Sequence, residues 1–153
     1  HNMEFLLGNI AYWILDKPLK IIIKDAHTKA WYGGIVKALG GIGINRSQKN
    51  DLVNFISQQF QKEDFSLVIC PEGTRSKVNK WKKGFYYMAL QAKVPIVIAT
   101  GDFKRKRLYI GYTIPYERLI NMPYEDILKE ISDYLIKYDI TPKIPENWNP
   151  NIQ

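Results

Sequence analysis

Short β-branched runs alternate with amphipathic stretches along most of this chain, and this alternation restricts its fold more than any other feature. The strand-like runs fall at residues 19–23, 42–44, 66–70, 96–100 and 107–112, and helical spacing of apolar residues marks 5–15, 29–39, 52–60, 84–92 and 123–138. Strands separated by helices are typical of parallel β-α-β units. The sequence therefore predicts an α/β fold with a mostly parallel central sheet flanked by helices, and an antiparallel edge strand at 107–112.

Glycine and proline mark the ends of several predicted helices. Gly40 and Gly41 follow the predicted helix at 29–39, where glycine adopts left-handed backbone at little cost. Pro123 opens the last helix, because proline fits the first helical position. A chain of 153 residues is long enough for one buried core. We expect a single domain over residues 1–140 and a C-terminal tail over 141–153.

The charge balance favours anionic partners. Lysine and arginine number 22 against 15 acidic residues, which suits phosphate esters, anionic lipids, acidic carrier proteins or nucleic acid. The apolar stretches are shorter than the roughly 20 residues of a membrane-spanning helix, so we expect peripheral contact with a membrane. The single cysteine, Cys70, fits a reducing compartment, and the residue pattern at the start of this sequence is not the one expected of a signal peptide. These features predict a place at the cytoplasmic face of a membrane.

A polar loop directly after the run 66–70 carries the residues best suited to chemistry. Its sequence is Pro71-Glu72-Gly73-Thr74-Arg75-Ser76. An arginine can bind a phosphate through two hydrogen bonds, and glycine lets the backbone approach a ligand closely. Glu72 could orient Arg75 or accept a hydrogen bond from a substrate hydroxyl. These residue types are equally compatible with an ordinary surface turn that carries an exposed salt bridge.

Three segments together resemble a known family. The hexapeptide 71–76 is similar to the Pro-Glu-Gly-Thr-Arg signature of the glycerolipid acyltransferases, which make phosphatidate from lysophosphatidate. Upstream, the glycine-rich run 40–46 ends in Arg46 and resembles the second block of that family. Downstream, Val-Pro-Ile-Val at 94–97 resembles its fourth block. The order and spacing of the three segments agree with the family as far as residue 99, which implies a fold like that of glycerol-3-phosphate acyltransferase.

The resemblance implies a substrate-binding site. Arg46 and Arg75 would hold the phosphate of a lysophosphatidate-like acceptor, and Glu72, Gly73 and Thr74 would shape the pocket for its glycerol backbone. The acyl group would come from acyl-CoA or acyl-carrier protein, acting as co-substrate. The resemblance implies no metal and no other cofactor.

The catalytic block of the family is a histidine followed, after four residues, by an aspartate. The histidine acts as general base and the carboxylate orients it. Here the corresponding residues are His1 and Glu4, with only two residues between them. Three interpretations stay open: two loop residues are absent from this sequence and His1 is the base, His1 is a tag remnant, or the enzyme is degenerate. The other histidine, His27, has no counterpart in the family and is predicted to be structural.

The remaining basic residues allow two further hypotheses. Lys83 follows the signature loop and could add charge near the site, although a lysine at the start of a helix is usually only solvated. The basic run 104–107 suits a solvated hairpin, or contact with an anionic lipid or an acidic carrier. A non-catalytic lipid- or phosphate-binding relative is therefore an alternative function. An RNA-binding domain is a third, but no nucleic-acid motif accompanies the basic residues, so we expect no nucleic-acid partner.

Overall fold

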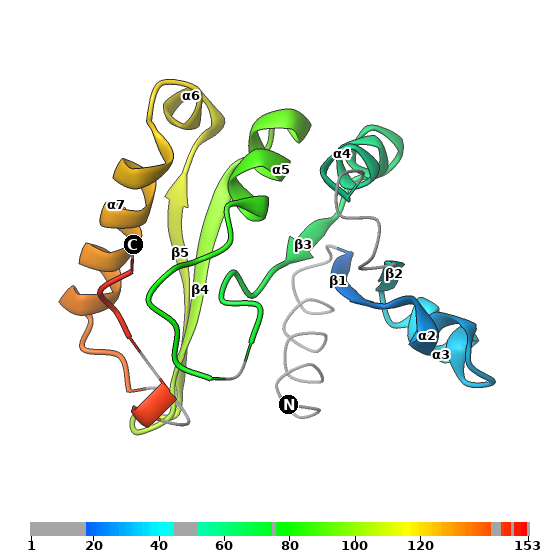
Figure 1. Cartoon of the computed structure of the whole chain (residues 1–153), viewed down its shortest axis with the longest axis horizontal. Coiled ribbons are helices and arrows are strands. Elements are labelled where there is room, and N and C mark those ends of the chain that lie inside the picture. The colour runs from blue at the N-terminus through cyan, green and yellow to red at the C-terminus, as the bar shows by residue number, and fades with distance from the viewer. Residues whose placement is uncertain (1–17, 45–51, 75, 142–144, 148, 153) are drawn as a thin grey trace. The chain divides into compact units, whose positions relative to one another are not determined.

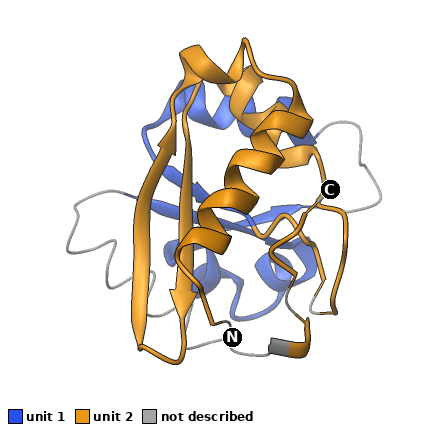
Figure 2. Ribbon diagram, turned by 90° about the vertical axis from the view of Figure 1, so that its left-hand side faces the viewer, with its two compact units in different colours: residues 1–69 blue, residues 70–153 orange. Residues whose placement is uncertain are grey.

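The computed structural model describes residues 18–44, 52–74, 76–141, 145–147 and 149–152 (Figure 1). The chain forms two compact units, which meet in the sequence between Ile69 and Cys70 (Figure 2). Each unit has its own sheet. The predicted boundaries of a domain over 1–140 and a tail over 141–153 stay predictions.

The first unit is built on three parallel strands. They are β1 (Leu19–Lys24), β2 (Gly41–Ile44) and β3 (Ser66–Val68), in the order β2-β1-β3. The helices of this unit are α2 (Asp25–Lys29), α3 (Gly33–Ala38) and α4 (Leu52–Lys62). The predicted α/β class and the parallel sheet flanked by helices are therefore confirmed. The predicted helix at 5–15 lies outside the described residues.

The segment between β1 and β2 differs from the prediction of one helix over 29–39. It forms α2 and α3, which are separated by a turn at residues 30–32. At the start of α3, a Cβ on Gly33 would lie 2.1 Å from the Thr28 carbonyl oxygen, so the two helices approach each other at a position that only glycine fits. This close approach breaks the helix that the spacing predicts. Gly40 has φ +84°, and the expected left-handed end after α3 is confirmed.

The second unit contains the remaining helices and an antiparallel strand pair. Its elements are α5 (Gly84–Ala92), β4 (Ile96–Asp102), β5 (Arg107–Ile114), α6 (Tyr116–Leu119), α7 (Tyr124–Lys137) and the 3-10 helix η1 (Pro145–Asn147). The antiparallel direction of β5 confirms the expectation for this strand, although among the described residues β4 and β5 pair only with each other. The short helix α6 was not predicted from the sequence.

The core of the second unit forms around one face of α7. Ile127, Ile131 and Leu135 are spaced by four residues and are all buried. Burying each such side chain stabilises the fold by about 1.5–3 kcal/mol. Ile152, from the tail, packs in the same cluster. The Ser132 hydroxyl also donates a hydrogen bond to the Pro150 carbonyl over 2.6 Å, so the described part of the tail packs on this core.

A β-bulge at Gly111 decides which side chains of β5 face α7. Cross-strand pairing shifts by one residue between Ile98 and Ala99, and Gly111 is the extra residue on β5, with φ +150°. The shift places Tyr109 and Tyr112 on the same face although three positions separate them. Without the bulge, alternation along the strand would direct one of these tyrosines to the opposite face.

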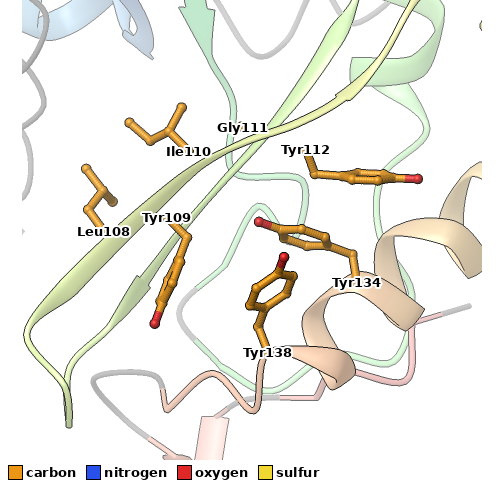
Figure 3. A pocket seen from close by; sticks show the side chains of 7 residues that line it. All are labelled: Leu108, Tyr109, Ile110, Gly111, Tyr112, Tyr134 and Tyr138. Atoms are coloured by element: carbon orange, nitrogen blue, oxygen red, sulfur yellow. The ribbon is translucent and has the colours of Figure 1, made fainter.

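The tyrosines on this face form an aromatic cluster with α7 (Figure 3). The ring centroids of Tyr112 and Tyr134 are 4.8 Å apart, as are those of Tyr134 and Tyr138. The cluster lines a pocket of about 360 Å³ that contains none of the residues predicted for the site. Leu108 and Ile110 point to the other side of the strand pair.

Candidate functional site

The signature loop begins three residues after β3 and is closed by two backbone hydrogen bonds. The Gly73 amide donates to the Cys70 carbonyl over 3.1 Å, which forms a tight turn at the start of the loop. The Lys82 amide donates to the Pro71 carbonyl over 2.9 Å and joins the end of the loop to its beginning. The segment 71–82 is therefore a closed loop that leads directly into α5.

Gly73 has a left-handed backbone, and a lysine lies against it. Its φ is +66°, which favours glycine over residues with a side chain. A Cβ at this position would lie 2.4 Å from Lys82 Nζ and 2.7 Å from Lys82 Cε. The lysine side chain thus occupies the space that a side chain at position 73 would need, and it brings an ammonium group onto the signature loop.

Glu72 is a carboxyl group held in a partly desolvated position. Its side chain is half-buried, and burial raises the pKa of the Glu72 carboxyl above its ordinary value. No ion pair or side-chain hydrogen bond of Glu72 is found among the described residues. A carboxylate oxygen can accept a hydrogen bond from a hydroxyl of a ligand.

Thr74 has a local role in the loop. Its hydroxyl oxygen accepts a hydrogen bond from the Ser76 amide over 3.3 Å, and its side chain is exposed. Such a bond forms a small turn that stabilises the loop backbone. The hydroxyl hydrogen is not used in this bond, so Thr74 can still donate a hydrogen bond to a ligand.

The far end of the loop is held by α7. The Tyr124 hydroxyl donates to the Trp81 carbonyl over 3.0 Å. Lys83 also contacts α7: its Nζ lies 3.3 Å from Glu125 Oε1 and 4.7 Å from the centre of the Tyr124 ring. The backbone hydrogen bond that the Glu125 carboxylate accepts, together with the ion pair with Lys83, lowers the pKa of the Glu125 carboxyl. Of the two neighbouring lysines, Lys82 contacts the signature loop, and Lys83, which the sequence singled out, does not.

The remaining predicted site residues lie outside the described part of the chain. These residues are His1, Glu4, Arg46 and Arg75. The strands before Arg46 and before the signature loop are both described: β2 and β3 run parallel in one sheet, so their carboxyl ends lie at the same edge. In α/β folds this edge is where ligands bind. The positions of the four side chains stay predictions.

The basic turn between β4 and β5 is held together by acidic partners. Arg105 Nη1 donates to Asp102 Oδ2 over 2.6 Å, and Arg105 Nη2 lies 3.1 Å from Asp139 Oδ2. Asp102 is buried, and the Arg105 amide also donates to it over 3.0 Å. This backbone bond and the guanidinium together lower the pKa of the Asp102 carboxyl. Arg105 therefore has a structural role, whereas Lys104 and Lys106 are exposed.

His27 is exposed in the middle of α2, and its Nδ1 lies 2.9 Å from the Tyr32 hydroxyl. This contact agrees with the structural role predicted for it. Nothing in the sequence distinguishes Lys82 from its neighbour Lys83. The two lysines differ in their tertiary contacts. The Lys82 amide donates a hydrogen bond to the Pro71 carbonyl, whereas Lys83 directly precedes α5, which starts at Gly84.

Comparison with known proteins identifies related chains. A family model described as Acyltransferase matches residues 5–99, which is more than half of the chain. A 1-acyl-sn-glycerol-3-phosphate acyltransferase of Cocos nucifera is 41% identical over 94 residues, covering 56% of this chain and 30% of that protein. The 1-acyl-sn-glycerol-3-phosphate acyltransferase beta of Homo sapiens is 35% identical over 103 residues, covering 59% of this chain and 37% of that protein.

The chain thus spans about a third of the length of these relatives. No solved structure matches it significantly. The helices in the described part of the chain include none with the length and apolar character of a membrane span.

Proposed function

Because this chain belongs to the acyltransferase family, we propose that it transfers a fatty acyl group from a thioester donor to a hydroxyl of a lysophosphatidate-like acceptor. The names of the two relatives support this choice of acceptor. The observation that carries the proposal is the signature loop, which contains the half-buried carboxyl of Glu72 and, at the next position, Gly73 with the Lys82 ammonium against it. A carboxylate and a cation on neighbouring positions suit an acceptor with a hydroxyl beside a phosphate.

In the proposed reaction, His1 removes the proton of the acceptor hydroxyl and Glu4 orients the imidazole. The hydroxyl oxygen attacks the thioester carbonyl and forms a tetrahedral intermediate. The carbon–sulfur bond then breaks, and the leaving thiolate takes the proton from the imidazolium. The products are the new ester and the thiol of CoA or of the carrier protein. Every proton is accounted for by the base and the two substrates.

The arginines have a separate task in this proposal. Arg46 and Arg75 bind the phosphate of the acceptor, because a guanidinium can donate two parallel hydrogen bonds to phosphate oxygens. Glu72 accepts a hydrogen bond from the glycerol backbone, and Thr74 supports the loop. Holding the acceptor in this way brings its hydroxyl to the base and lowers the entropic part of the barrier.

The test is acyl transfer by the full-length protein from labelled acyl-CoA, and separately from acyl-carrier protein, to lysophosphatidate. We expect a labelled phosphatidate product, and its loss by at least about a hundredfold in Arg75→Ala, since the proposed charge-assisted hydrogen bonds to the acceptor phosphate are lost. Lys129→Ala, which removes an exposed cation on α7, is the control and should keep full activity. Binding of lysophosphatidate without any transfer would instead favour a non-catalytic relative.

We also propose that the protein acts at the cytoplasmic face of a membrane as a peripheral protein. Each unit exposes an apolar stripe that supports this proposal. In the first unit, Trp31, Ile35 and Leu39 are spaced by four residues and are 94%, 64% and 46% exposed. In the second unit, Leu108 and Ile110 are 56% and 53% exposed on the outer face of the strand pair. Exposed apolar side chains of this kind insert into the headgroup region of a lipid surface.

Lys104 and Lys106, in the turn beside this outer face, would attract anionic lipids. The test is sedimentation of the protein with phosphatidylcholine vesicles that contain or lack an anionic lipid. We expect stronger binding to the anionic vesicles and weaker binding by Trp31→Ser. Equal binding to both vesicle types would contradict the role of the basic turn.

A further inference from the structure

The Lys82 ammonium lies on the signature loop and has no acidic partner among the described residues. Lys82 places its Nζ against Gly73, where a side chain would otherwise project. The residue is exposed, and no hydrogen bond or ion pair of its Nζ is found among the described residues. A solvated ammonium is held there by the backbone bond between Lys82 and Pro71, which fixes the position from which the side chain starts.

The neighbouring lysine, Lys83, has a structural role in the same segment. Lys83 forms an ion pair with Glu125 and lies over the Tyr124 ring, so its charge is balanced within the second unit. The two residues are adjacent in sequence and share the same charge, but within the described part of the chain only Lys83 has an acidic partner. The difference leaves Lys82 as the cation that can bind an anionic ligand at the loop.

We propose that Lys82 is a specificity-determining residue that binds the phosphate of the acyl acceptor. This inference rests on the proposed function. A phosphate monoester carries close to two negative charges at neutral pH, and lysine binds such a group as a point charge. The acceptor hydroxyl and phosphate belong to one glycerol unit. A carboxyl at position 72 and an ammonium against position 73 are the pair of groups that can bind both at once.

Two phosphates could reach this ammonium: that of the acceptor and those of a CoA donor. The place of Lys82 on the signature loop favours the acceptor, because Glu72 in the same loop can accept a hydrogen bond from the acceptor hydroxyl. Lys82 is accordingly expected to affect the Michaelis constant for the acceptor and not that for the donor. A donor effect would assign the ammonium to CoA instead.

The experiment compares Lys82→Ala, Lys82→Arg and the matched control Lys83→Ala in the full-length protein. Steady-state rates are measured with lysophosphatidate and with the monoacylglycerol of the same chain length, which lacks the phosphate. For Lys82→Ala we expect the KM for lysophosphatidate to rise about tenfold, as for the loss of one charge-assisted contact, with kcat and the donor KM nearly unchanged. Lys82→Arg should recover most of this loss, and Lys83→Ala should behave as wild type.

Transfer to monoacylglycerol, however slow, should be the same in wild type and Lys82→Ala, because that acceptor has no phosphate to bind. Binding of lysophosphatidate, followed by tryptophan fluorescence, gives a readout that does not need turnover. If wild type binds lysophosphatidate through Lys82 but transfers nothing, the proposed function fails and the phosphate site stands. If wild type transfers normally and Lys82→Ala does so equally well, the inference fails alone. If wild type neither binds nor transfers, both are wrong.

Discussion

Both the turn between β4 and β5 and the signature loop after β3 carry basic residues. The acidic partners of these residues differ between the two segments. In the turn, the Arg105 guanidinium is matched by Asp102 and Asp139, and Asp102 is buried. In the loop, the Lys82 ammonium lies on Gly73 and has no acidic partner among the described residues. The first arrangement uses its charges to hold the fold together, and the second leaves a charge for a ligand.

The net charge of +7 does not show which cations bind a ligand. The carboxylates that the fold places beside each cation do show this. Substitutions in the loop should therefore change activity more than stability, and substitutions in the turn should change stability more than activity.

The largest expected effect is on turnover. Glu72→Gln keeps the size of the side chain but removes its charge and half of its accepting capacity, and Glu72→Ala removes the group. We expect acyl transfer to fall by at least about a hundredfold in Glu72→Ala, and somewhat less in Glu72→Gln. Rates with labelled acyl-CoA and lysophosphatidate measure both variants.

The thermal stability of Glu72→Gln distinguishes a binding role of Glu72 from a structural one. Burial raises the pKa of Glu72, so the charged carboxyl is less favourable in the folded protein than in the unfolded chain. The cost is present at neutral pH and disappears as the pH falls below the folded pKa. Glu72→Gln should therefore unfold at the same temperature as wild type or slightly higher at pH 7. A clear loss of thermal stability would show that Glu72 is a structural residue, and would contradict the expectation that substitutions in the loop change activity more than stability.

The next effect is on stability in the turn. Asp102→Asn removes the charge that balances Arg105, and we expect the melting temperature to fall by several degrees at pH 7, with little effect on acyl transfer. Because the folded pKa of Asp102 is lowered, its contribution is complete above the unfolded value, near about pH 4, and is lost as pH falls through the folded pKa. The difference between wild type and variant should narrow in acid. A difference that stays constant down to about pH 2 would contradict this role.

The smallest effect concerns Gly73. Gly73→Ala would place a methyl group in a left-handed conformation and displace the end of the Lys82 side chain. We expect a loss of about 1–2 kcal/mol in the free energy of unfolding and a raised KM for the acceptor. Gly34→Ala is the matched control: no atom lies within 4 Å of its added Cβ, and its position in α3 favours alanine by about 0.5–1 kcal/mol. Equal responses to the two substitutions, measured by urea unfolding, would show that position 73 has no special geometry.

Elements with a strong local signal agree between sequence and structure. The strand β1, the helix α5 and the helix α7 after Pro123 lie where the pattern places them, because β-branched runs, helical spacing and proline act over a few residues. The antiparallel direction of β5 also follows from the short basic turn before it. Comparison confirms the family to which the signature loop points.

Features that depend on distant residues could not be predicted. The break between α2 and α3 follows from the contact of Gly33 with the Thr28 carbonyl, and spacing alone favours one continuous helix. The bulge at Gly111, which turns Tyr109 and Tyr112 to one face, depends on the partner strand. For the same reason the spacing 52–60 identified α4, but nothing in it showed which residues would surround that helix.

The α/β class, the positions of most strands and helices, and the family can all be inferred from the sequence, since each of these depends on local patterns or on a contiguous motif. The pairing of Lys83 with Glu125 and the contact of Lys82 with Gly73 arise from tertiary contacts. Two adjacent lysines are equivalent in a sequence. They become different when Glu125, on α7, and Gly73, in the signature loop, take positions that the local pattern does not encode.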